Sequence, residues 1–297
     1  MVRCLDSIIK QDYKHVEVII SDDSPNEDIK QVIDPYVNRL NVRYFHNSIS
    51  LGSPKNWNAV MDKAVGDYVL LLHQDDWFHA TDALTRFLFA FKEDNADFVF
   101  CQNTAIDENN NKQILQARPG LLSGMRSKPN HLLLAQVIGP PSNTMVKKSI
   151  PLRYDENFIW LVDVDYYSRL IKAGYQYHYI NSHLVSIGLH NDQTTEFCRT
   201  HPDIIFKENI MFSVKIGSKA FSDILIYDYY WRLLRNYGIR TIEDLDANGL
   251  LRHQIPAIIL HMLQRQKKHP LSILRQGIIS KILMTSSYLS WKFNPVK

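Results

Sequence analysis

Two pairs of adjacent carboxylates follow short apolar segments, and these residues are the best placed in the sequence to do chemistry. Asp22 and Asp23 come after the run 16–20, and Asp75 and Asp76 come after the run 68–72. Carboxylate oxygens suit Mg²⁺ or Mn²⁺, particularly where the cation also bridges substrate phosphates. Taken alone, either pair is explained more simply as turn or helix-cap residues, because aspartate is favoured in both places.

The elements that would position these pairs alternate along the first hundred residues. Apolar periodicity predicts strands at 16–20, 42–45, 68–72 and 97–101, and helices at 28–40, 53–65 and 80–93. This alternation is typical of an α/β domain with a parallel sheet and crossover helices. Ligands of such sheets bind beyond the carboxyl ends of the strands, so the two acidic pairs are expected to converge there.

The pattern changes in the later part of the chain. We expect a polar loop at 107–113, a proline-rich turn at 139–141, a helix at 162–173 and then two short strands. From about residue 202 the sequence is mostly helical, with interruptions at glycine and proline.

Ordered motifs over residues 5–195 carry a resemblance to a known family. They are Ser7–Tyr13 with Ser21-Asp22-Asp23-Ser24, then Asn47, Gly52, Asn56 and Asn58 with 66–68, then His73-Gln74-Asp75-Asp76, then 154–157 with 163–170, and finally His190–Thr195. In this order they resemble the family 2 inverting glycosyltransferases. The resemblance implies a GT-A fold, which is a Rossmann-like, mostly parallel sheet flanked by helices. We expect this catalytic domain at 1–200 and a helical, basic section at 201–297.

The resemblance also implies an activity, the transfer of a sugar from a nucleotide-diphosphate donor to a hydroxyl acceptor with inversion. Asp22 and Asp23 would lie at the nucleotide, with Asp23 on the base. UDP or dTDP donors are favoured, because a carboxylate only accepts hydrogen bonds and so selects an imide N–H. Asp75 and Asp76 would hold the ribose and a Mn²⁺ or Mg²⁺ ion.

Further residues receive roles by the same resemblance. Asp163 would be the general base and Asp165 the alternative, since two positions apart on a helix they point about 200° from one another. His190 would bind the metal or the diphosphate, or it is a structural histidine. Lys55 and Asn58, near the start of a helix, would contact the nucleotide, although a solvated lysine explains Lys55 equally well and helix capping is slightly favoured for Asn58.

Three departures from the family pattern support an alternative function. His73 stands where the family has its first aspartate, and Val162 replaces an acidic residue before Asp163. By the same resemblance we expect the family's opening strand to be missing from the start of the sequence. The alternative is a catalytically impaired module that binds nucleotide sugars. A phosphotransferase is disfavoured, since the sequence has no glycine-rich phosphate loop.

Composition limits the class of protein. The 297 residues are 45% hydrophobic and 22% charged, which excludes a disordered chain. Cys4, Cys101 and Cys198 are too few and too widely spaced for a disulfide framework or a zinc site. No segment approaches the roughly 20 apolar residues of a membrane span, and no signal peptide is recognisable. We therefore expect a cytoplasmic protein.

The net charge of +3 conceals an uneven distribution. Residues 249–297 contain no Asp or Glu, whereas eight basic residues lie there: Arg252, Arg265, Lys267, Lys268, Arg275, Lys281, Lys292 and Lys297. Apolar residues at 271, 274, 278, 282 and 289 predict an amphipathic helix. It would lie either on an anionic membrane, at the inner face where a saccharide or lipid-linked acceptor is found, or against the catalytic domain. Nucleic acid is not expected as a partner.

Overall fold

The first predicted strand forms β1 (Glu17–Asp22), which pairs in parallel with β2 (Asn41–His46). These two strands make a small sheet of their own. Helices α1 (Val2–Ile9) and α2 (Asp28–Ile33) contribute to its core, in which Leu5, Ile20, Ile33 and Tyr36 are buried together. The register pairs Asp22 with His46, so both strands end at the same edge.

A second, six-stranded sheet has the order β3-β7-β5-β8-β4, with β6 paired to β5. Strands β5 and β8 are parallel, whereas β7 is antiparallel to β3 and β5, β4 to β8, and β6 to β5. The bounds are β3 (Tyr68–Leu70), β4 (Trp77–Phe78), β5 (Phe98–Asp107), β6 (Lys112–Leu115), β7 (Thr144–Lys147) and β8 (Tyr177–Leu189). The sheet is therefore mixed, and the expectation of a mostly parallel sheet is wrong. The strand at 144–147, which the sequence analysis did not identify, inserts antiparallel between its neighbours.

The centre of this sheet is fully buried. Strand β5 has Phe98, Val99 and Phe100 without solvent exposure, as expected for a strand covered on both faces. Helix α4 (Ala83–Glu93) packs Phe87 into the same core. This buried centre holds β8 in place through its pairing with β5. The end of β8 lies beside the loop that follows β3.

The remaining helices of this part largely match their predicted positions. They include α3 (Ser53–Lys63) and α6 (Val162–Lys172), whereas α5 (Pro119–Gly124) was not predicted. The helix expected at 28–40 stops earlier, at Ile33, and continues as a 3-10 turn over Asp34–Tyr36. Pro35 lacks a backbone N–H, so it cannot continue the α-helical hydrogen bonds.

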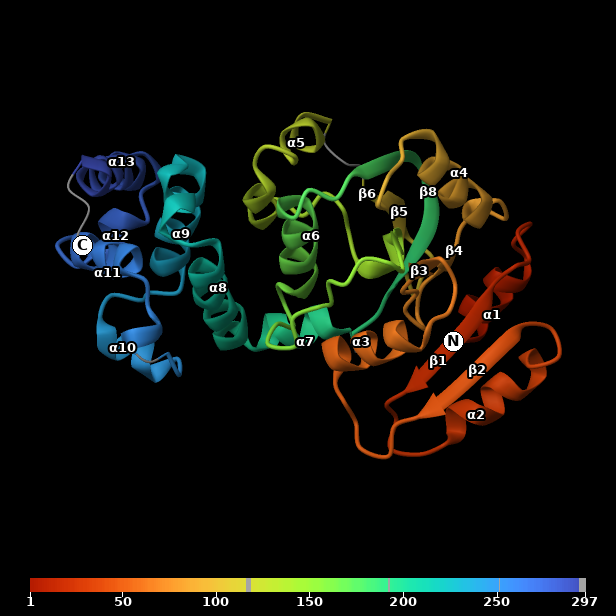
Figure 1. Ribbon diagram of the computed structural model, residues 1–297. Coiled ribbons are helices and arrows are strands. Elements are labelled where there is room, and N and C mark those ends of the chain that lie inside the picture. The colour runs from red at the N-terminus through yellow and green to blue at the C-terminus, as the bar shows by residue number, and fades with distance from the viewer. Residues whose placement is uncertain (116–118, 192, 251, 294–297) are drawn as a thin grey trace. The chain divides into compact units, whose positions relative to one another are not determined.

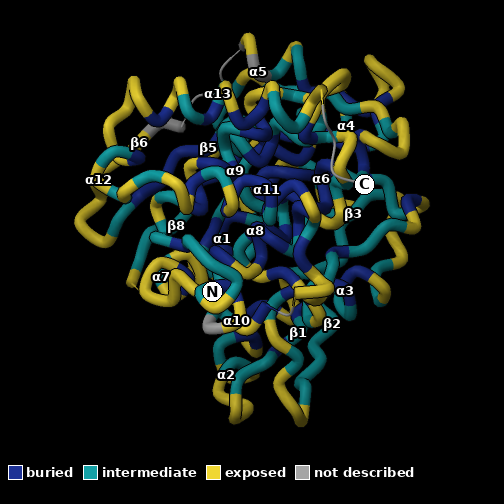
Figure 2. The backbone as a smooth tube through the Cα atoms, turned by 90° about the vertical axis from the view of Figure 1, so that its left-hand side faces the viewer, coloured by how far each residue is buried: buried dark blue, intermediate teal, exposed yellow. Residues whose placement is uncertain are grey.

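The computed structural model describes residues 1–115, 119–191, 193–250 and 252–293, and it divides the chain into two compact units, Met1–Gln193 and Thr194–Lys297. Figure 1 shows the elements of each unit, and Figure 2 shows burial along the chain, with β5 and α11 buried in dark blue. The second unit is helical: α7 (Thr194–Thr200), α8 (Pro202–Ile216), α9 (Ile224–Asn236), α10 (Ile242–Ala247), α11 (Ala257–Gln266), α12 (Leu271–Leu274) and α13 (Gly277–Phe293). The boundary expected after residue 200 differs from this division by α7.

All three cysteines are free and buried. Burial raises the pKa of Cys4 and of Cys101 to about 12, and it also raises the pKa of Cys198. Among the described residues, no helix combines the length and the apolar character that crossing a bilayer would require.

Candidate active site

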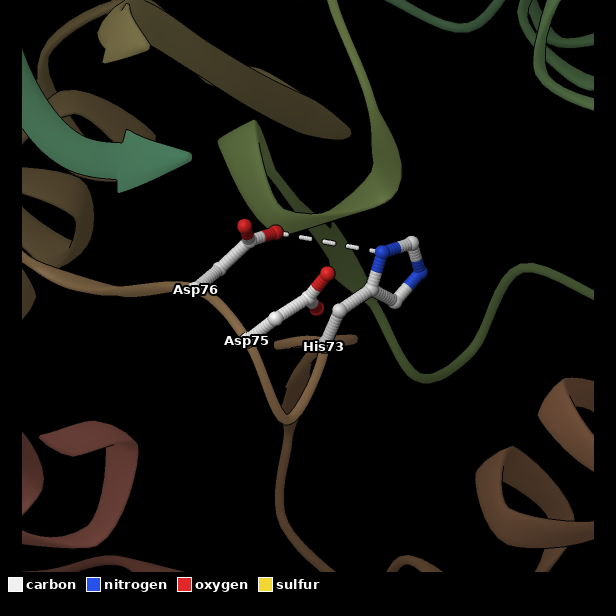
Figure 3. A group of neighbouring side chains, drawn as sticks. All are labelled: His73, Asp75 and Asp76. Atoms are coloured by element: carbon white, nitrogen blue, oxygen red, sulfur yellow. Dashed lines mark ion pairs between the residues drawn. The ribbon is translucent and has the colours of Figure 1, made fainter. Parts of the chain in front are cut away.

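His73, Asp75 and Asp76 lie together in the loop that follows β3. Their ligand atoms are all within 4.8 Å of one another, and Figure 3 shows the three side chains converging. Asp76 is buried and accepts hydrogen bonds from Ser142 Oγ (2.5 Å) and from the Gly188 N–H (3.1 Å). Burial, and then the charge of Asp75, raise the pKa of Asp76 to about 7 despite these hydrogen bonds. A bound cation would relieve this repulsion.

His73 takes its position from an aromatic neighbour. Its ring stacks on Trp57 of α3, with the ring centroids 5.1 Å apart. Its Nδ1 lies 3.8 Å from Asp76 Oδ2, and its buried Nε2 has no hydrogen-bond partner among the residues that the structure describes. Burial lowers the pKa of His73, which favours the neutral imidazole, the form that binds metal ions.

The end of β8 closes against this group. His190 Nε2 lies 2.9 Å from Asp75 Oδ2, which places the predicted histidine beside the acidic loop. A Cβ added to Gly188 would come within 2.5 Å of the Asp75 carbonyl oxygen, so only glycine permits this approach. Asp192, in the same predicted loop motif, and Lys297 lie outside the described residues.

The first acidic pair is engaged by the protein itself. Asp22 is buried and accepts from the Ser24 N–H, the Ser24 hydroxyl and the Tyr44 hydroxyl. Asp23 accepts four donors from the segment after β2: the Asn47 amide, the Ser50 hydroxyl and the N–H groups of Leu51 and Gly52. Burial alone would raise the pKa of Asp23, but these hydrogen bonds hold the pKa below its usual value.

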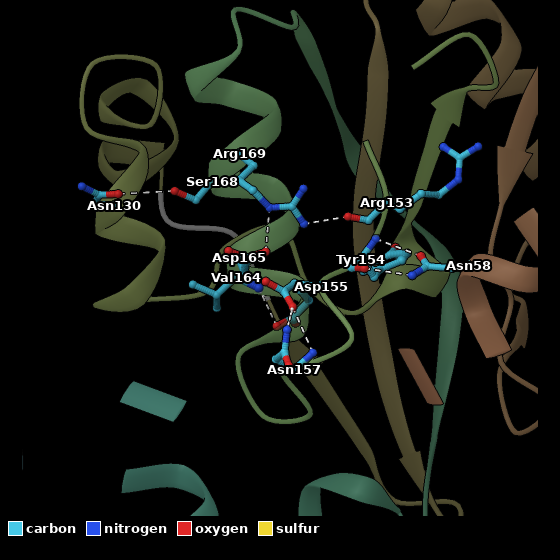
Figure 4. Close-up of polar contacts among 11 residues, drawn as sticks. Asn58, Asn130, Arg153, Tyr154, Asp155, Asn157, Val164, Asp165, Ser168 and Arg169 are labelled. Atoms are coloured by element: carbon cyan, nitrogen blue, oxygen red, sulfur yellow. Dashed lines mark hydrogen bonds and ion pairs between the residues drawn. The ribbon is translucent and has the colours of Figure 1, made fainter. Parts of the chain in front are cut away.

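Helix α6 carries two aspartates in different surroundings. Asp165 is 1% exposed and forms an ion pair with Arg169 at 2.7 Å, and Arg169 also donates to the Arg153 carbonyl, as Figure 4 shows. Asp163 is only partly buried and accepts from the Val164 N–H. Burial raises the pKa of Asp163 to about 6, although Val164 and the Gln136 side chain favour its charged form. Of the two, Asp163 has the carboxylate for which the described residues provide no ion pair, and it has the pKa of a general base near neutral pH.

A tripeptide connects the acidic loop to this helix. Ser142 bonds to Asp76, and two residues later Thr144 donates its hydroxyl hydrogen to the Tyr167 hydroxyl oxygen of α6. Both the 3-10 turn Pro141–Asn143 and β7 are buried here. The loop after β3 and the helix that carries Asp163 are therefore held by consecutive residues.

Asn58 makes a second connection, from α3 to the segment before α6. Its amide donates to the Tyr154 carbonyl and its oxygen accepts from the Tyr154 N–H, as Figure 4 shows. The amide also donates to Glu156 Oε1. Asn58 is buried and its amide is hydrogen-bonded within the protein, and the nucleotide contact expected of it stays a prediction. Lys55, three residues earlier, is exposed on the same helix.

Sequence reasoning did not single out Trp57 or Gly188, and it considered Ser142 only as part of the turn at 139–142. The turn at 139–142 was a signal, but its partner Asp76 is 66 residues away. Nothing local in the sequence identifies Gly188 as the glycine under Asp75.

Comparisons with known proteins identify the family of the chain. Residues 1–165 match glycosyl transferase family 2. An uncharacterized glycosyltransferase of Rickettsia felis is 28% identical over 123 residues, which are 41% of this chain and 20% of that protein. The chain spans only 14 to 26% of the length of the first curated relatives that it matches.

Two solved structures share the fold. TarS of Staphylococcus aureus, in complex with UDP-GlcNAc, has a TM-score of 0.62 at 15% identity, over 98% of this chain and 87% of that chain. The mannosyltransferase PcManGT of Pyrobaculum calidifontis, in complex with GDP-Man and Mn²⁺, has a TM-score of 0.54 at 12% identity, over 98% of this chain and 83% of that chain. With a family match that covers more than half of its length, and with this mixed α/β fold of GT-A type, the chain belongs to glycosyl transferase family 2.

Proposed function

We propose that the chain transfers a sugar from a nucleotide-diphosphate donor to a hydroxyl group of a saccharide or lipid-linked acceptor, with inversion at the anomeric carbon. The observation that carries the proposal is the group formed by His73, Asp75 and Asp76, tied to the helix of Asp163 through 142–144. UDP and dTDP are the favoured donors, and TarS, crystallised with UDP-GlcNAc, supports a UDP-sugar. Assembly of bacterial surface polysaccharide is the process in which we place this activity.

The acidic loop suits a divalent cation. His73, Asp75 and Asp76 would hold it, because their ligand atoms lie within 4.8 Å of one another and His73 faces Asp76 with its Nδ1, at 3.8 Å. When bound, the ion would neutralise charge that develops on the leaving diphosphate. An imidazole among carboxylates favours Mn²⁺ over Mg²⁺, and the structure of PcManGT with Mn²⁺ supports this choice.

Asp163 acts as the general base in this proposal. It takes the proton of the acceptor hydroxyl while that oxygen bonds to the anomeric carbon. The bond from this carbon to the diphosphate oxygen breaks on the opposite face, and its electron pair leaves with the diphosphate. Asp165 was the alternative base, but its carboxylate is paired with Arg169, so it holds the helix in place.

The donor side depends on the segment at 47–52. Asp23 accepts four hydrogen bonds from this segment, so we propose that it shapes the nucleotide site and reaches the base only by releasing one of them. Asp22 accepts hydrogen bonds from Ser24 and Tyr44, so in this proposal it shapes the nucleotide site as Asp23 does. Lys55, exposed in the first turn of α3, is the proposed phosphate contact.

Metal replacement and substitution test the proposal. The full chain is freed of metal with a chelator, and hydrolysis of UDP-sugars is measured after adding Mn²⁺ or Mg²⁺. We expect Mn²⁺ to restore more activity than Mg²⁺, and Asp75→Asn to lose about a hundredfold or more. Asp94→Asn, on an exposed aspartate beside His178, is the matched control and should retain full activity.

The same measurement distinguishes the proposed transferase from the alternative function. Nucleotide-sugar binding without turnover, unaffected by Asp163→Asn, would support a catalytically impaired binding module. Absence of both binding and turnover with UDP- and dTDP-sugars would refute the proposal.

A further inference from the structure

Helix α13 has a polar buried face. Ser280, Met284, Ser287 and Tyr288 are its buried residues, and the helix packs on α9, α11 and α12. Ser280 accepts from Trp231 Nε1 at 3.2 Å, and Ser287 Oγ lies 2.7 Å from the Tyr227 hydroxyl. Hydroxyl groups thus fix the helix to the second unit.

The opposite face is apolar and exposed. Ile278 is 80% exposed, Ile282 63%, Leu289 44% and Phe293 74%. At about 100° per residue these four positions fall within about 60° of one another, and they lie opposite the serines. The helix therefore has inverted polarity, with its serines inside and its large apolar residues outside. Leu271 and Leu274, which were expected on the same face, belong to α12, and Leu274 is fully buried.

Basic residues accompany the apolar row. Lys281 and Lys292 are exposed and lie along one edge of it, within about 60° of Ile278 around the helix axis. Lys267, Lys268 and Arg275 are also exposed in the segments that precede α13. Since residues 249–297 contain no carboxylate side chain, this region repels other cations and attracts a surface of opposite charge.

We propose that the outward face of α13 binds an anionic phospholipid bilayer, with Ile278, Ile282, Leu289 and Phe293 among the acyl chains and the lysines at the phosphate groups. Such a combination of a strong apolar face and flanking lysines is what holds an amphipathic helix in a membrane interface. Because the buried face is already occupied, the helix can lie on the lipid without leaving its unit.

Charge argues against a second copy of the chain as the occupant. A symmetric pairing of two α13 faces would bring Lys281 and Lys292 of both copies together. The segment 249–297 offers no Asp or Glu to neutralise them. Anionic lipid, in contrast, supplies negative charge for the lysines and acyl chains for the apolar residues. The inference concerns the second unit and is independent of the proposed transferase activity.

Sedimentation with vesicles tests the proposal on the full chain. The protein is mixed with vesicles of phosphatidylcholine alone, or with a one-third share of phosphatidylglycerol, at low and at physiological salt. We expect binding to the anionic vesicles, weakened by salt, and little binding to phosphatidylcholine. The combined Ile278→Ser, Ile282→Ser and Phe293→Ser variant should bind more than tenfold more weakly, and Lys281→Gln or Lys292→Gln about fivefold each.

Two further measurements make the result decisive. The variant Val214→Ser with Leu225→Ser changes exposed apolar residues of α8 and α9 in the same unit, and should bind as the unchanged chain does. Circular dichroism and donor hydrolysis should be unaltered in all variants, since none of these residues is buried or belongs to the catalytic site. Equal binding by the triple variant would overturn the proposal. So would failure of the unchanged chain to bind anionic vesicles, or a dimer in light scattering that the triple variant abolishes.

Discussion

Asp163 and Asp165 are two residues apart on α6, and the structure gives them different tasks. For Asp163→Asn we expect transfer to fall about a thousandfold, because the amide cannot take the acceptor's proton. Donor binding should persist, and thermal stability should be kept or slightly increased, since burial penalises the charged carboxylate that the variant lacks. Steady-state transfer, nucleotide titration and melting curves measure the three quantities.

Asp165→Asn is the matched comparison. It removes a charge-assisted hydrogen bond to Arg169 in a buried position, so stability should fall by about 2 kcal/mol. A normal melting temperature for Asp165→Asn, combined with lost turnover, would exchange the roles assigned to the two residues.

The pH dependence of transfer follows from the raised pKa of Asp163. The pKa is about 6, and the carboxyl accepts a proton only when it is ionised. The turnover rate should therefore rise as pH increases through about 6 and level off above it. The profile is recorded with saturating donor and acceptor. A rate that stays constant across this range would show that another group takes the proton.

Residue types and order predicted that His190 would lie near the acidic loop, and the structure places it beside Asp75, while the roles of these residues stay predictions. The acidic loop, His190 and α6 were all identified from the sequence. The engagement of Asp22 and Asp23 was not, because all of their donors except Ser24 lie 22 to 29 residues further along the chain, in Tyr44 and in 47–52. Local sequence shows that an aspartate ends a strand, but not how many of its lone pairs the fold will use.

At the scale of elements, the approach of β8 to the loop after β3 depends on one glycine. In Gly188→Ala the new Cβ would collide with the Asp75 carbonyl, so the loop must shift. We expect Mn²⁺ affinity to fall about tenfold, as is usual when the support of a metal site is disturbed. Calorimetric titration of Mn²⁺ into the chelator-treated chain measures this.

Gly66→Ala provides the control for that substitution. Its Cβ would lie 3.6 Å from the Tyr68 carbonyl oxygen, an ordinary contact. If Gly188→Ala bound Mn²⁺ as tightly as Gly66→Ala and the unchanged chain do, the close approach of β8 would not support the metal site.

Element positions were predicted better than strand pairing. The runs at 16–20, 42–45, 68–72 and 97–101 all became strands, because β-branched and aromatic residues favour them. The direction of strand pairing in the sheet was misjudged. The segment 144–147 is too short to show a clear apolar period, and its antiparallel partners in β3 and β5 are 40 or more residues away in the sequence. Strand β8 was expected as two short strands, because its polar residues at 181–183 interrupt the apolar run.

At the scale of the whole molecule, each unit has buried residues of its own, so the units should unfold as separate cooperative bodies. Differential scanning calorimetry should show two transitions. UDP with Mn²⁺ should raise the midpoint of one of them, that of Met1–Gln193, because a ligand stabilises only the unit that binds it. A single transition that shifts as a whole would contradict this independence.

The burial of all three thiols has a practical consequence for such measurements. A thiolate, not a thiol, reacts with maleimides and disulfide reagents, and Cys4, Cys101 and Cys198 are shielded and held protonated. The folded native chain should therefore not react with these reagents. A cysteine introduced at position 282 could then be labelled with a single fluorophore, without first removing any native residue, and its emission would report directly on what touches that helix.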